Sequence, residues 1–258
     1  MYCINLDKKI YIKYMITIFS VLPALIYIFI IYLSTPYNTV NLTKGIKFLF
    51  GGMISAILIL LSAKIFPNFY NDLFLNQHFP MLTRHGIFYK KTMLTEFVKA
   101  FYQIAAMEEF FKFLLFYIIY KFFSKKDNIN SIWIIFSCIL VASGFAMLEN
   151  VMYAVRNNQT FEDILLQRSF TAVVLHMTCG TIIGYFTAIG LKHSIYKDGK
   201  SEFWVWLRKN KHYKSFLYSA FGVFLAICLH GLYDFDIAIE SGYHTIITIG
   251  SLILGFFL

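Results

Sequence analysis

Charged side chains are scarce in this sequence of 258 residues. Asp, Glu, Lys and Arg together make up 14% of it, whereas hydrophobic residues make up 59%. Soluble domains contain about 25% charged residues and about half apolar residues. Apolar runs close to the ~20 residues that a helix needs to cross a bilayer recur along the chain. The composition therefore excludes an ordinary soluble domain and predicts an integral membrane protein.

The chain also lacks the patterns of two other architectures. Short segments of alternating apolar and polar residues, which are typical of membrane-spanning strands, are absent. Cysteine occurs four times without a CxxC or zinc-finger spacing, and Cys138, Cys179 and Cys228 fall in apolar runs. We therefore expect buried free thiols and an all-α, polytopic bundle of transmembrane helices.

We expect about seven spans in a single integral-membrane domain that covers 1–258. The predicted spans lie at about 14–33, 46–66, 97–123, 131–155, 168–191, 215–235 and 245–258. The segment 69–91 is too polar to cross the membrane, and we expect it to lie along the interface before the third span. The first span is too long for the apolar region of a signal peptide and lacks a small-x-small cleavage site after it, which favours a retained anchor.

Positive charge is spread over the loops between the predicted spans. The net charge of +9 is typical of basic loops that face anionic lipid, so we expect a lipid bilayer and no nucleic acid as a partner. Twelve lysines and arginines fall on one side of the predicted membrane and eight on the other. The positive-inside rule places the side with twelve in the cytoplasm.

Glu108, Glu109 and Lys112 lie within the otherwise apolar third span. A charge at the centre of a membrane helix costs about 2.5–3.5 kcal/mol. The spacing of three and four residues brings both carboxylates within reach of the Lys112 ammonium on a helix. A self-neutralising ion pair that only fixes helix packing is one interpretation. We favour a functional site, because intramembrane charges mark such sites and because polar residues recur in three later spans.

The later polar residues complete a pattern. Glu149 lies late in the fourth span, and His176 lies early in the fifth. His230 lies late in the sixth span, and Asp234 follows four residues later on the same helix face. Because successive spans run in opposite directions, these residues and the early third-span glutamates fall toward one side of the membrane. We expect one site, within a catalytic core of about 93–240, that opens toward the extracytoplasmic face.

Carboxylates and imidazoles support two kinds of hydrolysis. In the first, they hold Zn²⁺, which lowers the pKa of bound water to about 7 and polarises a carbonyl. In the second, no metal is bound: a buried glutamate activates water, and a histidine stabilises the oxyanion. The HExxH sequence of soluble zinc proteases and the GxSxG turn of serine hydrolases are both absent. The sequence leaves the two mechanisms open.

Four short motifs follow one another on separate spans. They are Glu108-Glu109-x-x-Lys112, Gly144-Phe145-x-x-x-Glu149-Asn150 with Tyr153, Arg168 followed by His176 and Gly184, and His230-x-x-x-Asp234. Together they resemble the PrsW-type family of intramembrane proteases, which is related to the CPBP and prenyl-protease superfamily. The resemblance implies a multi-helix endopeptidase described as metalloprotease-like. The best-known family role is the first cut in a membrane-anchored anti-sigma factor, on its outer side, during envelope stress.

The resemblance also implies roles for individual residues. It implies that Glu108 and Glu109 are catalytic carboxylates, with Glu108 as the base, and that Lys112 orients or neutralises them. It implies that the remaining site residues bind a metal, for which we expect Zn²⁺, or activate water. These residues are Glu149, His176, His230 and Asp234.

The main hypothesis is an intramembrane endopeptidase that hydrolyses a peptide bond of a membrane-tethered protein, such as an anti-sigma factor, in the cell membrane. A proton-coupled transporter or channel is one alternative, since buried carboxylates and histidines also build proton relays. Transporters often contain internal repeats, and this sequence shows none. A non-catalytic immunity or scaffold protein of the same fold is the second alternative, and its site residues would be dispensable.

A reporter fused after Leu258 tests the predicted orientation. Seven spans with the more basic loops inside place this end in the cytoplasm. We expect activity from a reporter that works only in the cytoplasm and none from a reporter that requires export. The opposite pattern would contradict the orientation.

Overall fold

The computed structural model describes residues 18, 20–36, 39–66, 93–123, 130–156, 161–195, 211–239 and 249–250. Within these residues the protein is helical and contains no strand, which confirms the expected all-α class. The predicted interfacial segment 69–91 and nearly all of the predicted seventh span lie outside the described residues.

The described helices differ widely in length. A helix at Ser20–Ser34 comes first. The others are α2 (Leu42–Ile65), α6 (Met93–Val98), η1 (Lys99–Ala105), α7 (Ala106–Phe123), α8 (Ser131–Arg156), α9 (Phe161–Phe170), α10 (Ala172–Ile195) and α12 (Lys211–Ala238).

Four stretches of helix are long and apolar enough to cross a membrane, which supports a membrane location. They are Leu42–Ile65, Ser131–Val155, Leu165–Lys192 and Ser215–Ala238, close to the second, fourth, fifth and sixth predicted spans. The expected count of seven is not confirmed. The helix Ser20–Ser34 is shorter, and α7 carries four charged residues among its 18.

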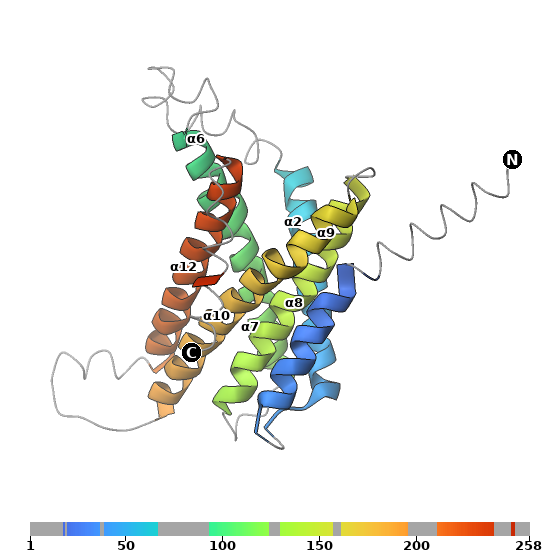
Figure 1. Ribbon diagram of the computed structural model, residues 1–258. Helices are drawn as coiled ribbons and strands as arrows, with labels where there is room; N and C mark the ends of the chain where they lie inside the picture. The colour runs from blue at the N-terminus through green and yellow to red at the C-terminus, as the bar shows by residue number, and fades with distance from the viewer. Residues whose placement is uncertain are drawn as a thin grey trace, which may run out of the picture.

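Helices α8 and α10 form the centre of the bundle. α10 packs against α8 and α12, and α2 packs against α8 and α7; in Figure 1, α10 crosses the bundle obliquely. The apolar stretches of Ser131–Val155 and Leu165–Lys192 are 72% and 78% buried, against 33% and 28% for α2 and α12. Most residues in these two stretches therefore face protein neighbours rather than lipid.

Aromatic residues and small thiols fill the apolar part of this core. The buried Phe48 ring lies 6.0 Å from that of Phe116 and 5.7 Å from that of Trp133, in the second case edge to face. Cys138 and Cys179 are buried and free, as expected, whereas the free Cys228 is only partly buried. Such dense packing holds helices together in lipid, where apolar surface gains little from leaving the solvent.

Asparagine side chains begin both α2 and α8. Asn41 Oδ1 accepts a hydrogen bond from the Lys44 N–H at 3.0 Å, and Asn130 Oδ1 accepts one from the Ile132 N–H at 3.0 Å. These caps satisfy N–H groups that have no partner inside the helix. The Asn130 side chain also donates to the Thr39 carbonyl at 3.2 Å. The two helices thus begin at one end of the bundle and run parallel, as the second and fourth of alternating spans should.

Glycines bring the backbones of α2 and α8 together. A Cβ atom at Gly52 would collide with the carbonyl oxygen of Val141, and one at Gly144 would collide with that of Leu49. Small residues at such contacts allow the close approach that stabilises helix pairs in membranes. This contact fixes the position of α8, which carries Glu149.

The third predicted span is divided rather than being one regular helix. The short α6 leads into the π-helical η1, where the Ala106 N–H donates to the Phe101 carbonyl five residues back. π-helical turns are frequent at functional sites. η1 packs against α12, and a Cβ at Gly231 would lie 2.7 Å from the Phe101 ring. This contact sets the start of α7 against the part of α12 that holds His230.

The close contact of α2 and α8 predicts that Gly52→Ala destabilises the protein. Overpacking of a tight interface costs about 1–3 kcal/mol. Thermal unfolding of the purified protein in detergent measures the change. Gly45→Ala is the matched control on the same helix, because its Cβ would meet only the flexible end of Leu140 at 2.8 Å. Equal losses in the two variants would contradict the backbone contact.

Candidate functional site

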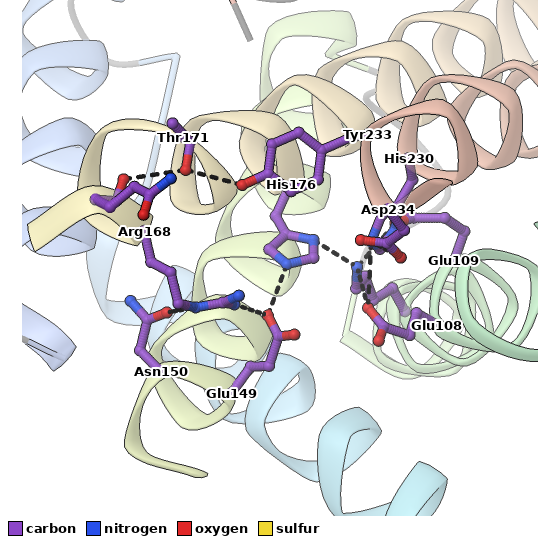
Figure 2. A network of polar contacts seen from close by, with 12 residues as sticks. Glu108, Glu109, Glu149, Asn150, Arg168, Thr171, His176, His230, Tyr233 and Asp234 are labelled. Carbon is purple, nitrogen blue, oxygen red and sulfur yellow. Dashed lines mark hydrogen bonds and ion pairs between the residues drawn. The ribbon is translucent and has the colours of Figure 1, made fainter. Parts of the chain in front are cut away.

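The structure brings all seven residues singled out in the sequence into one polar network. Figure 2 shows six of them labelled. The start of α7 contributes Glu108, Glu109 and Lys112, and the end of α12 contributes His230 and Asp234. α8 contributes Glu149, and α10 contributes His176. Four helices therefore meet here. This agrees with the alternation of spans, which predicts that these residues fall toward one common side of the bundle.

Lys112 lies at the middle of the network. Its Nζ donates to Glu109 Oε1 at 2.8 Å and contacts His176 Nδ1 at 3.0 Å. Glu108 Oε2 is 3.5 Å away, and the Phe145 ring centre is 4.0 Å away. The Glu109 side chain is fully buried and that of Lys112 is 3% exposed. The ion pair expected within one helix is thus present, and it also reaches a histidine of a second helix.

His230 connects α12 to the same carboxylates. Its Nδ1 lies 2.8 Å from Glu109 Oε1. Its Nε2 lies 3.4 Å from Asp234 Oδ2 and 3.8 Å from Glu108 Oε2. His230 and Asp234 share a helix face, in agreement with their spacing of four residues. The His176 ring packs at 4.9 Å from the His230 ring, almost at a right angle, so the two imidazoles face one centre.

Arg168 holds the opposite side of His176 through Glu149. Arg168 Nη2 donates to Glu149 Oε2 at 2.6 Å, and Arg168 Nε donates to Asn150 Oδ1 at 2.8 Å. Glu149 Oε2 also lies 2.8 Å from His176 Nε2. The guanidinium stacks 3.9 Å above the Tyr153 ring. Arg168 belongs to one of the motifs that resemble the PrsW-type family, but no role was assigned to it. Its separation of eight residues from His176 places both on one face of a helical span.

A hydrogen bond near the site joins α12 to the junction of α9 and α10. The Tyr233 hydroxyl donates to Thr171 Oγ1 at 2.8 Å. Thr171 is the single residue between α9 and α10, yet its N–H still bonds the Gln167 carbonyl at 3.1 Å, so the span continues through it. No role was expected for this pair, because neither residue belongs to a charged motif. The bond fixes the turn of α12 that carries His230 and Asp234.

Three buried side chains are placed as a metal site would require. Glu108, His176 and His230 each offer one ligand atom, and these atoms lie within 4.8 Å of one another. One carboxylate with two imidazoles is a donor set of catalytic zinc sites. Of the ligands expected from the sequence, His176 and His230 belong to this group. Glu149 and Asp234 lie beside it, each against one of the two histidines.

Unsatisfied carboxylate oxygens surround the three donors. Within the described residues, Glu108 Oε2, Glu109 Oε2 and Asp234 Oδ2 are buried and accept no hydrogen bond. A buried anionic oxygen requires a cation, a donor or a water molecule. A carboxylate on the far nitrogen of a ligating histidine, such as Glu149 on His176, is also typical of metal sites. The residues present therefore fit a divalent metal.

The fold and the site define a helical membrane protein with a buried cluster of carboxylates and histidines. The family model described as PrsW family intramembrane metalloprotease matches residues 43–258, so the chain belongs to this family. It is 31% identical over 153 residues to the protease PrsW of Oceanobacillus iheyensis, which covers 59% of this chain and 60% of that protein.

A second relative gives the same result. The chain is 28% identical over 155 residues to the protease PrsW of Halalkalibacterium halodurans, which covers 60% of this chain and 61% of that protein. The chain thus matches about three fifths of the length of these relatives. No solved structure matches it.

The contact of Arg168 with Glu149 predicts a large loss of stability in Arg168→Met. Removing one partner of a buried ion pair costs about 3–5 kcal/mol, because the other charge stays buried. The double variant Arg168→Met/Glu149→Gln removes both charges and keeps an acceptor for His176, so we expect it to be more stable than Arg168→Met alone. Unfolding in detergent measures both. The pairing would be contradicted if the double variant lost as much stability as Arg168→Met and Glu149→Gln lose separately, added together.

Proposed function

We propose that the protein is an intramembrane endopeptidase that hydrolyses a peptide bond of a membrane-tethered protein. The observation that carries this proposal is the buried cluster of Glu108, His176 and His230 in a protein with four membrane-length helices. Water activation requires a base and a polar group that holds the water, both shielded from bulk solvent. Membership of the PrsW family supports the same reaction.

We assign the general base to Glu108. Its Oε2 accepts no hydrogen bond from the described residues and lies 3.8 Å from His230 Nε2. One water molecule can bond both atoms across such a gap. Glu109 is less suited, because its Oε1 already binds Lys112 at 2.8 Å and His230 at 2.8 Å. Glu109 instead positions Lys112 and His230.

The reaction follows from these positions. The water oxygen attacks the carbonyl carbon of the scissile bond while Glu108 takes one water proton. Glu108 then passes this proton to the amide nitrogen as the C–N bond breaks, which leaves a new carboxyl group and a new amine. Glu109 and Asp234 hold His230 in place from its two ring nitrogens. Arg168 and Glu149 hold His176.

In the alternative mechanism, a divalent metal, for which Zn²⁺ is the proposal, would be held by Glu108, His176 and His230, and Glu108 would then be a ligand and not the base. When bound, it supplies Lewis-acid polarisation of the scissile carbonyl. The carboxylate of Glu149 would then fix the ring orientation of His176.

The number of spans, the orientation of the site and the kind of substrate belong to the same proposal. We propose a multi-pass arrangement of about seven spans in the cell membrane, with the site toward the extracytoplasmic face, on the distribution of Lys and Arg over the loops. The substrate we propose is a membrane-anchored protein, and an anti-sigma factor or other envelope-stress regulator is the specific form suggested by the family resemblance.

Glu108→Gln and His230→Ala should each abolish cleavage, by about 10²–10⁴-fold, the usual contribution of general acid–base groups. Since the substrate is unidentified, mass spectrometry of new protein N-termini in membranes of expressing cells is the measurement. We expect new termini close to the spans of membrane-anchored proteins with the wild type and their loss with both variants.

Glu96→Gln is the matched control for these variants. Glu96 lies on α6, and the same replacement there leaves the polar network intact. We expect it to retain the wild-type termini. The same termini from Glu108→Gln and His230→Ala, with both proteins folded and inserted, would contradict the proposed function.

A further inference from the structure

The Lys112 ammonium lies among the candidate metal donors. Its Nζ is 3.0 Å from His176 Nδ1 and 3.5 Å from Glu108 Oε2, and both residues belong to the group of three donors. It also donates to Glu109 Oε1 at 2.8 Å. An ammonium has three N–H donors and no lone pair. The ammonium therefore bonds Glu109 and His176 and forms a longer ion pair with Glu108. A metal would also need His176 and Glu108.

The contact with Lys112 decides which nitrogen of His176 carries the proton. Because the ammonium can only donate, His176 Nδ1 accepts. The proton then lies on Nε2, which donates to Glu149 Oε2 at 2.8 Å. Figure 2 shows the His176 ring between Glu149 and the part of the site that holds Glu108. The lone pair that faces the donor group is thus the one that Lys112 occupies.

A metal and the ammonium cannot use this lone pair together. Zinc binds an imidazole nitrogen at about 2.0–2.1 Å, so along the same line it would lie only about 1 Å from the present position of Nζ. Lys112 would have to leave, and its charge would repel the metal. The Phe145 ring at 4.0 Å and the Glu109 carboxylate at 2.8 Å both favour the present position.

We propose that Lys112 is a built-in cation that competes with a divalent metal for His176 and Glu108, and that it thereby weakens metal binding at this site. In the arrangement observed, Lys112 is the group that balances the buried carboxylates of α7. Replacing Lys112 by an uncharged side chain frees the lone pair of His176 and leaves a carboxylate-rich cavity that favours a divalent cation.

Titration of Zn²⁺ into the full-length protein in detergent, followed by calorimetry, tests the competition. Metal affinity is measured without a substrate, so the result is independent of the proposed endopeptidase function. We expect Lys112→Met to bind Zn²⁺ at least about ten-fold more tightly than the wild type, a change typical of groups next to metal ligands. Lys47→Met is the matched control: this lysine of α2 lies 3.7 Å above the Phe123 ring, and its loss should leave the affinity unchanged.

Further variants show where the metal binds. Adding His176→Asn to Lys112→Met should remove the gain in affinity. Equal or weaker Zn²⁺ binding by Lys112→Met would overturn the proposal. If Lys112→Met fails to fold, His176→Asn in the otherwise wild-type protein decides the question. Little change in Zn²⁺ affinity supports the competition, since Lys112 already occupies this histidine, whereas a loss of about ten-fold or more overturns it.

Discussion

The bundle depends on the compensation of charge around Lys112. A charge at membrane depth costs about 2.5–3.5 kcal/mol on insertion scales, and Glu109, the most deeply buried of these groups, has no exposed side-chain surface. The ammonium lowers this cost only if it stays beside the carboxylates. His230 and His176 are bound to the same groups, at 2.8 Å and 3.0 Å. Helices α7, α10 and α12 must therefore meet at this point, and a shift of any one of them would leave a buried charge without its partner.

His176 joins this cluster to a second ion pair. One ring nitrogen contacts Lys112, and the other contacts Glu149, which Arg168 binds at 2.6 Å. The imidazole therefore connects α7 with α8 through two hydrogen bonds. Such a ring has a fixed orientation, which is what a group that binds a metal or positions water requires. Stability and proposed chemistry thus use the same contacts, so substitutions here need a stability measurement beside any measurement of activity.

The apolar packing places these polar groups at one depth. The glycine contact between Gly52 and α8 fixes the helix that carries Glu149. The π-helical η1 and its contact at Gly231 set the start of α7 against the end of α12. Sequence alone did not reveal this division of the third predicted span, because a π-helical turn has the same apolar composition as the helix around it. It is frequent at functional sites, and here it lies directly before Glu108 and Glu109.

The sequence by itself determined the class of the fold, the approximate bounds of four membrane-length helices, and the side of the bundle on which the polar residues meet. Length of apolar runs, helical spacing and alternation of direction suffice for these properties, since all of them are local or follow from the order of the spans. Only the tertiary structure decided which polar groups become partners. Lys112 meets His176 across 64 residues, and His230 meets Glu109 across 121. The position of α10 between α8 and α12, and the rotation of each helix about its axis, arise from packing along whole helix faces. For that reason Glu108, rather than Glu149, joins the two histidines, and Arg168 holds Glu149.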